Sequence, residues 1–273
     1  MSRPAADDNP ADAVPLEPLR FALFAGRPLR HGVTRRAPGL HHDGDISYAT
    51  GGDPAAVYGT RRRWLAALGA DAADVVAARQ VHGARVAAVT MRDRGRGAQA
   101  LANALPETDA LVTDAPGLPL LLTYADCTSL LLYDPVRHVA GVAHAGWRGT
   151  VADVAGATVA ALAAHYGSRP ADLLAGIGPA IGPCCYVVGP EVITAWRALG
   201  ISDDAVVRAI PDRPAQWYFD LPRANRLLLE RAGLPPARIE DAAICTACRV
   251  ADYFSHRAEH GRAGRFAAVI ALE

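Results

Sequence analysis

Short apolar runs that end in glycine or proline alternate along the chain with longer segments rich in alanine and leucine. The short runs have the length of β-strands, whereas apolar residues recur at helical spacing in the longer segments. A Gly-Pro pair precedes the third long segment and Gly167 follows the second, as helix start and stop signals do. The pattern predicts strands at residues 21–24, 75–78, 85–90, 110–113, 119–124, 129–133, 139–143, 173–177, 242–245 and 266–272, and helices at residues 54–68, 150–166, 190–199 and 221–232.

The arrangement of these segments indicates one domain. No fixed-period repeat occurs, and no later stretch has the composition of an interdomain linker. Residues 1–18 are rich in proline, aspartate and alanine and offer little to bury, so we expect a disordered tail there. We therefore predict a single domain of mixed α/β class over residues 19–273.

The charge balance of the chain limits its partners. Its 273 residues include 28 basic and 28 acidic side chains, and every basic one is arginine. A net charge of zero argues against nucleic acid as the main partner, because binding to a phosphate backbone needs a basic excess. The absence of lysine excludes Schiff-base chemistry and the lysine-dependent phosphate-binding loop.

Hydropathy and cysteine content predict a cytoplasmic protein. The longest apolar runs, such as residues 118–122, fall far short of the roughly 20 residues of a transmembrane helix, so no membrane span is expected. The N-terminus lacks the basic-then-apolar layout of a signal peptide. Five cysteines is an odd number, and we expect them to be reduced thiols.

Polar side chains follow three predicted strands at the points where the strands end. These side chains include His82, Cys127 and His144, and strand ends of one sheet lie close together, so the three can converge. Two imidazoles and a thiolate suit Zn²⁺, and three protein ligands with a free fourth position are typical of catalytic zinc. The ion would hold Cys127 deprotonated and activate a water. Taken singly, each histidine also fits a purely structural role.

The segment after His144 adds a candidate anion site. Gly146 and Gly149 flank Trp147 and Arg148, just before a helix predicted to begin at Thr150. Backbone N–H groups at a helix start, together with an arginine, suit a phosphate. The alternative is that the tryptophan is a core residue and the arginine a surface charge.

Two other clusters are interpreted as structural. Cys245 and Cys248 form a C-x-x-C, but a four-cysteine zinc site needs a second such pair, and the adjacent Cys184 and Cys185 do not fit that geometry. We expect small buried thiols there, with a redox dithiol as the alternative. Residues 256–260 match the H-x-x-E-H of inverted zinc proteases, but the glycines that follow and the lack of an apolar helix face argue against that class.

Five strings of the sequence carry a resemblance to a known family. They are RQVHG (79–83), TDALVTDAPGLPLLLTYADC (108–127), GVAHAGWRGTV (141–151), GIGPAIGPCCYVVGPEV (176–192) and CTACRVADYFSHRAEHGRAGR (245–265). In this order they resemble the motifs of the YfiH-like laccase-domain family over about residues 30–273. The resemblance implies a layered α/β/β/α architecture and Zn²⁺ bound by His82, Cys127 and His144.

The same resemblance implies a zinc-dependent purine nucleoside phosphorylase with adenosine deaminase activity. Its expected partners are phosphate and a purine nucleoside, namely adenosine, inosine, guanosine or methylthioadenosine, and its expected products are the base and ribose 1-phosphate. Monomer and homodimer both stay open. Some relatives are instead called peptidoglycan editing factors, and older descriptions treat the family as copper-dependent polyphenol oxidases.

We add a hypothesis for the roles of the residues around the ion. Phosphate is expected near Arg148 and near Arg36 or Arg61, while Asp126 supplies or relays the proton that the purine takes as it leaves. The alternative for Asp126 is a capping role in the turn before Ser129. By resemblance alone, Ser255, His256 and Arg257 shape the nucleoside pocket.

Departures from the family pattern fall in the N-terminal part. An Asn-Leu-Gly motif is not recognisable in residues 47–53, Thr60 replaces an asparagine before Arg61, and Ser129 replaces a proline. For the deamination, zinc hydroxide would attack C6 of adenine, yet the glutamate that zinc deaminases carry is not evident beside the ligands.

Three other classes of function compete with this hypothesis. A copper oxidase fits a His₂Cys set, but the axial methionine is scarce, since Met1 and Met91 are the only two, and the nine histidines include no H-x-H pair. A hydrolase can use Cys127 as the nucleophile with His82 or His144 as its base, acting on a cell-wall precursor. A non-enzymatic binding module is the third, although it gives no reason for the cluster.

Overall fold

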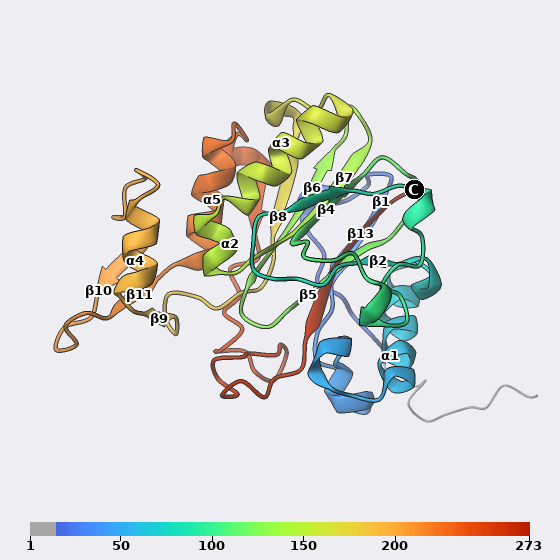
Figure 1. Ribbon diagram of the computed structural model, residues 1–273, viewed down its shortest axis with the longest axis horizontal. Helices are drawn as coiled ribbons and strands as arrows, with labels where there is room; N and C mark the ends of the chain where they lie inside the picture. The colour runs from blue at the N-terminus through green and yellow to red at the C-terminus, as the bar shows by residue number, and fades with distance from the viewer. Residues whose placement is uncertain (1–14) are drawn as a thin grey trace, which may run out of the picture.

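Two β-sheets stack face to face at the centre of the computed structural model, which describes residues 15–273 (Figure 1). One sheet has four strands in the order β1-β13-β5-β2, and the other has six in the order β12-β8-β6-β7-β4-β3. The strands of the two sheets are β1 (Leu29–Val33), β2 (Val76–Ala77), β3 (Val86–Ala88), β4 (Ala110–Thr113), β5 (Leu120–Tyr124), β6 (Thr128–Asp134), β7 (Val139–Ala145), β8 (Leu174–Ile177), β12 (Ile239–Asp241) and β13 (Phe266–Leu272).

The central strands are almost wholly apolar because both of their faces are covered. In β5, Leu120 and Leu122 point into the layer between the two sheets, whereas Leu121 points to the outer face and packs with Trp64 of helix α1 (Pro54–Ala67). A strand buried on both sides has no need of polar alternation. Each fully buried leucine of this kind contributes about 1.5–3 kcal/mol to the free energy of unfolding.

Helices also cover the outer face of the six-stranded sheet. Leu130 and Leu132 of β6 pack there with Val159 of α3 (Val154–Tyr166) and Leu228 of α5 (Leu221–Arg231). The layers therefore run helix, sheet, sheet, helix, and the predicted α/β class with α/β/β/α layering is confirmed.

A small third sheet lies to the side of these layers together with α4 (Pro190–Arg197), at the left of Figure 1. Its strands, in the order β10-β11-β9, were not predicted because they are two or three residues long and mostly half-exposed. Trp196 of α4 packs edge-to-face on Phe219 with ring centroids 5.8 Å apart. The three strands are β9 (Val187–Val188), β10 (Val207–Ala209) and β11 (Trp217–Phe219).

The predicted strand at residues 21–24 is wrong. Ala22–Phe24 form a short 3₁₀-helix, which places the side chains of Phe21 and Phe24 against the ring of His31. The strand in this region is β1, which pairs antiparallel with β13. The hydropathy pattern did not indicate it, because its sequence contains an arginine, a histidine and a glycine.

Two further predicted elements need correction. The strand expected at residues 242–245 ends earlier, as β12, since Ala243 has a left-handed backbone with φ +52° and Cys245 makes only an isolated bridge to Ala180. The helix expected at residues 150–166 is two helices, α2 (Trp147–Val151) and α3. Asp153, with φ +58°, separates them and caps α3 through Gly156 N–H at 2.9 Å.

Of the predicted tail at residues 1–18, residues 1–14 lie outside the described part of the chain, and Leu16 packs against the cluster that contains Trp64. Across residues 15–273, none of the helices combines the length and the apolar character needed to cross a bilayer.

Candidate metal and active site

Three side chains from separate elements meet where the two sheets touch. His82 follows β2 of the four-stranded sheet, His144 lies near the end of β7 of the six-stranded sheet, and Cys127 lies in the turn from β5 to β6 that crosses between them. One imidazole nitrogen from each histidine and the sulfur of Cys127 all lie within 4.8 Å of one another. The expected convergence is therefore present, but it joins two sheets rather than the strand ends of one.

A buried carboxylate holds two of the three in place. Asp109, immediately before β4, is fully buried and accepts hydrogen bonds from the backbone N–H groups of Val81, His82 and Gly83 at 3.2, 2.9 and 2.8 Å. These bonds keep His82 in a left-handed backbone with φ +62°, a conformation that costs a non-glycine residue about 1–2 kcal/mol.

The same carboxylate orients the second histidine. Nδ1 of His144 donates to Asp109 Oδ1 at 2.9 Å, so the other ring nitrogen is left for a ligand, as in most protein metal sites. Burial alone would raise the pKa of Asp109, but the hydrogen bonds from His144 and Gly83 outweigh it and lower the pKa below its usual value. Sequence reasoning missed Asp109, because an aspartate before an apolar strand is also typical of a plain turn.

Charge couples the thiol to its neighbours. Burial alone would raise the pKa of Cys127, but the charges and hydrogen bonds of His144 and His82 lower it to about 6. Burial likewise favours neutral His144, whereas Cys127 and Asp109 raise the pKa of His144 to about 9. Without a metal the pair is a thiolate and an imidazolium at neutral pH, so a divalent cation has only the imidazolium proton to displace.

The backbone beside the cluster leaves no space for a side chain. A Cβ atom on Gly146 would lie 2.8 Å from the sulfur of Cys127 and 3.0 Å from Cδ2 of His82. Helix α2 begins at the next residue, Trp147, and not at Thr150 as expected. The donor set of one thiolate and two imidazoles therefore sits against a glycine, and its chemistry and spacing fit Zn²⁺.

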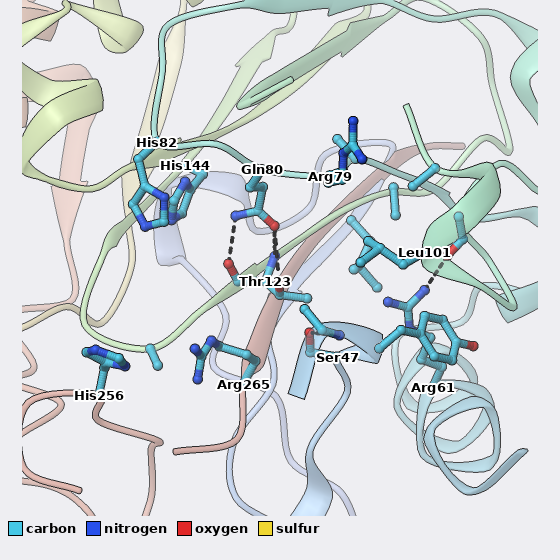
Figure 2. A pocket seen from close by; sticks show the side chains of 18 residues that line it. Ser47, Arg61, Arg79, Gln80, His82, Leu101, Thr123, His144, His256 and Arg265 are labelled. Carbon is cyan, nitrogen blue, oxygen red and sulfur yellow. Dashed lines mark hydrogen bonds between the residues drawn. The ribbon is translucent and has the colours of Figure 1, made fainter. Parts of the chain in front are cut away.

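A cavity of about 350 Å³ opens beside the cluster, with His82 and His144 at one end and Arg61 at the other (Figure 2). The Gln80 side chain spans the middle and pairs with the Thr123 backbone through bonds of 2.8 and 2.9 Å. The volume is in the range of small-molecule sites. The polar side chains that line it are Ser47, Tyr48, Arg61, Arg79, Gln80, His82, Thr123, His144, His256 and Arg265.

Of the arginines singled out from the sequence, Arg61 is the one that lines this cavity. It is buried, stacks 4.3 Å from the ring centre of Tyr48, and donates to the carbonyl groups of Ile46 and Gly97 at 2.9 and 2.6 Å. Burial lowers its pKa to about 10, so it stays cationic at neutral pH. Three of its possible donor contacts are thus already made with the protein itself.

Arg148 and Arg36 lie outside this cavity. Arg148 is exposed and stacks over Trp147 at 4.4 Å, which matches the alternative of a surface charge. Arg36 pairs with Glu259, stacks 4.1 Å from the ring centre of Phe254, and lines a neighbouring cavity of about 420 Å³.

The remaining predicted residues form a network behind the site. Both carboxylate oxygens of Asp126 accept hydrogen bonds, from the Thr246 hydroxyl at 2.6 Å and from the Arg257 backbone N–H at 2.7 Å. The Arg257 side chain donates to a carbonyl at 2.9 Å, and the buried Ser255 hydroxyl accepts from a backbone N–H at 3.1 Å. From this segment it is His256 that reaches the cavity.

Sequence reasoning missed part of the cavity lining. Arg79, Gln80 and Arg265 received no role, although the first two stand in the RQVHG string and the last ends the C-terminal string. The H-x-x-E-H residues form turns rather than the helix that the inverted zinc-protease motif requires.

The four other cysteines are not the small buried thiols that we expected. Cys184 and Cys248 are exposed, Cys185 and Cys245 are half-buried, and the four sulfurs lie within 4.8 Å of one another. The adjacent pair therefore does meet the C-x-x-C pair in space.

Known proteins resemble this chain over most of its length. The family model described as multi-copper polyphenol oxidoreductase laccase matches residues 30–273. Purine nucleoside phosphorylase YlmD of Geobacillus stearothermophilus is 38% identical over 252 residues, which are 90% of this chain and 89% of that protein. Adenosine deaminase RL5 of an unknown prokaryotic organism is 36% identical over 210 residues, 76% of this chain and 78% of that one.

The fold agrees with these matches. The crystal structure of YlmD from Geobacillus stearothermophilus superimposes with a TM-score of 0.86 and 36% identity, covering 93% of this chain and 94% of that chain. A family match over nearly the whole chain and relatives of this similarity show that the chain belongs to the multi-copper polyphenol oxidoreductase laccase family, the YfiH-like laccase-domain family that its motifs resemble.

Proposed function

We propose that this chain is a zinc-dependent purine nucleoside phosphorylase that also deaminates adenosine. The observation that carries the proposal is the donor set of His82, Cys127 and His144 at the end of a cavity of nucleoside size. Relatives named purine nucleoside phosphorylase and adenosine deaminase support the two activities. A zinc ion held by the three ligands supplies a Lewis acid at the end of the cavity.

Phosphate binding falls to arginine, because the chain has no lysine. Arg61, Arg79 and Arg265 come from three different segments and line the same cavity, so they surround it with positive charge. Arginine binds phosphate as a planar fork with paired N–H donors. Arg79 is exposed and its guanidinium is the one best able to reorient toward an entering phosphate.

In the phosphorolysis, an oxygen of phosphate forms a bond to C1′ of the ribose while the bond from C1′ to the purine nitrogen breaks. The products are ribose 1-phosphate and the free base, which takes a proton. His256 is the imidazole of the cavity that is not a metal ligand, and imidazole is the side chain that transfers protons most readily at neutral pH. We therefore assign the proton transfer to His256 and give Asp126 the role of holding the His256 segment through Arg257 N–H.

Deamination uses the same cavity with water in place of phosphate. Water adds its oxygen to C6 of adenine and ammonia leaves, which yields inosine. No carboxylate lines the cavity in the described chain, so we assign the proton transfers of this reaction to His256 as well.

A second function has one specific observation in its favour. Cys127, His144 and Asp109 lie in series, with the Cys127 sulfur within 4.8 Å of a His144 ring nitrogen and His144 hydrogen-bonded to Asp109, which is the order of nucleophile, base and orienting acid in cysteine hydrolases. A metal-free protein that cleaves an acyl substrate would support this alternative.

One experiment separates these functions. The purified protein is incubated with adenosine, with and without phosphate, and adenine, inosine and hypoxanthine are measured together with bound zinc and copper. We expect phosphate-dependent adenine release that disappears in Cys127→Ala. Stoichiometric copper with no purine product, or activity in metal-free protein, contradicts the proposal.

The arginine assignment has its own control. Arg79→Ala and Arg265→Ala are expected to raise the KM for phosphate at least tenfold, since each removes a charge-assisted contact of about 1.5–3 kcal/mol. Arg92→Ala, which removes an exposed arginine away from the cavity, is expected to leave the KM unchanged.

A further inference from the structure

Four thiols gather in a second cluster outside the cavity. Cys184 and Cys185 lie in the turn between β8 and β9, and Cys245 and Cys248 lie between β12 and β13. The sulfur of Cys248 is 3.5 Å from that of Cys184 and 3.4 Å from that of Cys185, and all four sulfurs lie within 4.8 Å of one another. The fold thus brings together two pairs that are far apart in the sequence.

The spacing matches a tetrahedral metal site. Zinc–sulfur bonds of about 2.3 Å give a tetrahedron whose sulfur–sulfur edges are about 3.8 Å. A disulfide instead needs a sulfur–sulfur bond of about 2.05 Å. Cys248 is almost equally far from both sulfurs of the adjacent pair and lies well beyond bonding distance of either, so it is paired with neither of them.

The backbone fixes the sulfurs before any ion enters. The Gly182 N–H donates to the sulfur of Cys245 at 3.2 Å, and Thr246 N–H donates to the Ala180 carbonyl at 3.0 Å, so the two turns are joined by their main chains. Donation of N–H groups to a sulfur favours the thiolate, which is the form that binds metals.

We propose that Cys184, Cys185, Cys245 and Cys248 bind one Zn²⁺ in a closed site with four sulfur ligands, separate from the site of His82, Cys127 and His144. Four soft donors select zinc among the common divalent cations. Four protein ligands leave no open position, so the ion has a structural role.

This ion supports the first site through one residue. Thr246 lies between Cys245 and Cys248, and its hydroxyl bonds to Asp126, the neighbour of Cys127. Asp126 also accepts from Arg257 N–H, next to His256 of the cavity wall. The four-cysteine ion therefore anchors the turn that presents both a ligand of the first site and a wall of the cavity.

Metal counting tests the proposal. Protein purified under reducing conditions and loaded with zinc is expected to hold two equivalents, and one after Cys127→Ala or after the double substitution Cys184→Ser and Cys248→Ser. Combining all three substitutions is expected to leave none. The double variant should also unfold at a lower temperature than the wild type, because a structural ion contributes directly to folding.

A second measurement is independent of whether the double variant folds. Cys127→Ala protein titrated with Co²⁺ is expected to show the intense charge-transfer absorption of a tetrahedral site with four thiolates. A wild type that holds one equivalent of zinc, all of it lost in Cys127→Ala, overturns the proposal. So does a Cys127→Ala protein without that absorption, or a mass corresponding to disulfides in freshly reduced, zinc-loaded protein.

Discussion

Asp109→Asn is the sharpest test of how the first site is held. Each oxygen of this buried carboxylate accepts two hydrogen bonds: Oδ1 from His82 N–H and His144 Nδ1, and Oδ2 from the N–H groups of Val81 and Gly83. Asparagine has the same shape, but its NH₂ group replaces one oxygen. In either orientation, two donors then face a donor.

The magnitude follows from those bonds. Hydrogen bonds to a charged group are worth about 1.5–3 kcal/mol each, so losing two lowers the free energy of unfolding by about 3–6 kcal/mol. That is a large part of the roughly 5–15 kcal/mol of a typical domain. The loop that carries His82 also loses its anchor, and outer partners of metal ligands typically contribute 10- to 100-fold in affinity.

Two assays measure the effect. Denaturant unfolding gives the change in stability, and competition with a chromophoric chelator gives the zinc affinity of the first site. Asp114→Asn, an exposed aspartate at the other end of β4, is the matched control and is expected to resemble the wild type. If Asp109→Asn binds zinc as tightly as the wild type and unfolds at the same denaturant concentration, the assigned role of Asp109 is refuted.

Three further predictions follow from the described contacts. Gly146→Ala should remove zinc from the first site while the fold persists, because its Cβ would lie 2.8 Å from the sulfur of Cys127. The control Gly59→Ala, whose Cβ would have nothing within 4 Å, should keep the metal. Equal metal content in the two variants would contradict the steric argument. In metal-free protein, the rate of alkylation of Cys127, measured by mass spectrometry, should rise with pH through a midpoint near 6, since the pKa of this thiol is lowered to about 6. Cys184, whose pKa is raised to about 11, should react only in strong alkali. A midpoint near pH 9 for Cys127 would refute the coupling to the histidines. Arg61→Met should lower the free energy of unfolding by about 2–4 kcal/mol in denaturant titration, because it leaves the buried carbonyl groups of Ile46 and Gly97 without this donor, whereas the Ala98 carbonyl keeps its bond from the Tyr48 hydroxyl. Unchanged stability would mean that these bonds contribute nothing net.

The pKa shifts of Cys127 and His144 determine how the stability of the metal-free protein depends on pH. The folded-state pKa of Cys127 is depressed from 9.0 to about 6, so its contribution to stability is fully present above pH 9 and is lost as the pH falls through 6. The pKa of His144 is raised from 6.5 to about 9, so its contribution is fully present below pH 6.5 and is lost as the pH rises through 9. The metal-free pair is therefore most strongly coupled between about pH 6 and pH 9.

The central strands could be predicted from the sequence because strands buried on both faces consist almost entirely of apolar residues. Residues 110–112 and 266–272 are apolar throughout, and the structure places strands at those positions. Strand β1 could not be found this way, since Arg30 faces solvent, Gly32 has no side chain and His31 is buried with its Nε2 accepting from Phe21 N–H. Its position depends on pairing with β13, a partner at the other end of the chain.

The three candidate ligands could be predicted because each follows an apolar run, and a polar residue at such a point stands out. The residues that orient them could not, since Asp109 acts through contacts across the fold that no local pattern carries. The four-cysteine cluster was missed although its spacing is visible in the sequence. The rule that a four-cysteine site needs two C-x-x-C pairs excluded the adjacent Cys184 and Cys185. The turn after β8 nevertheless brings these two sulfurs within 4.8 Å of those of Cys245 and Cys248.

The candidate ligands of the first site belong to both layers of the molecule, with His82 on the side of the four-stranded sheet and His144 on the six-stranded one. An ion bound by both must dissociate before the sheets can separate, so metal binding and the stability of the central core are thermodynamically linked. Binding then stabilises the fold by RT ln(1 + [Zn²⁺]/Kd), about 2.7 kcal/mol at a hundredfold excess over Kd. A chelator would act on this protein as a mild denaturant, and a purine nucleoside that tightens the ion would protect the whole core from hydrogen exchange.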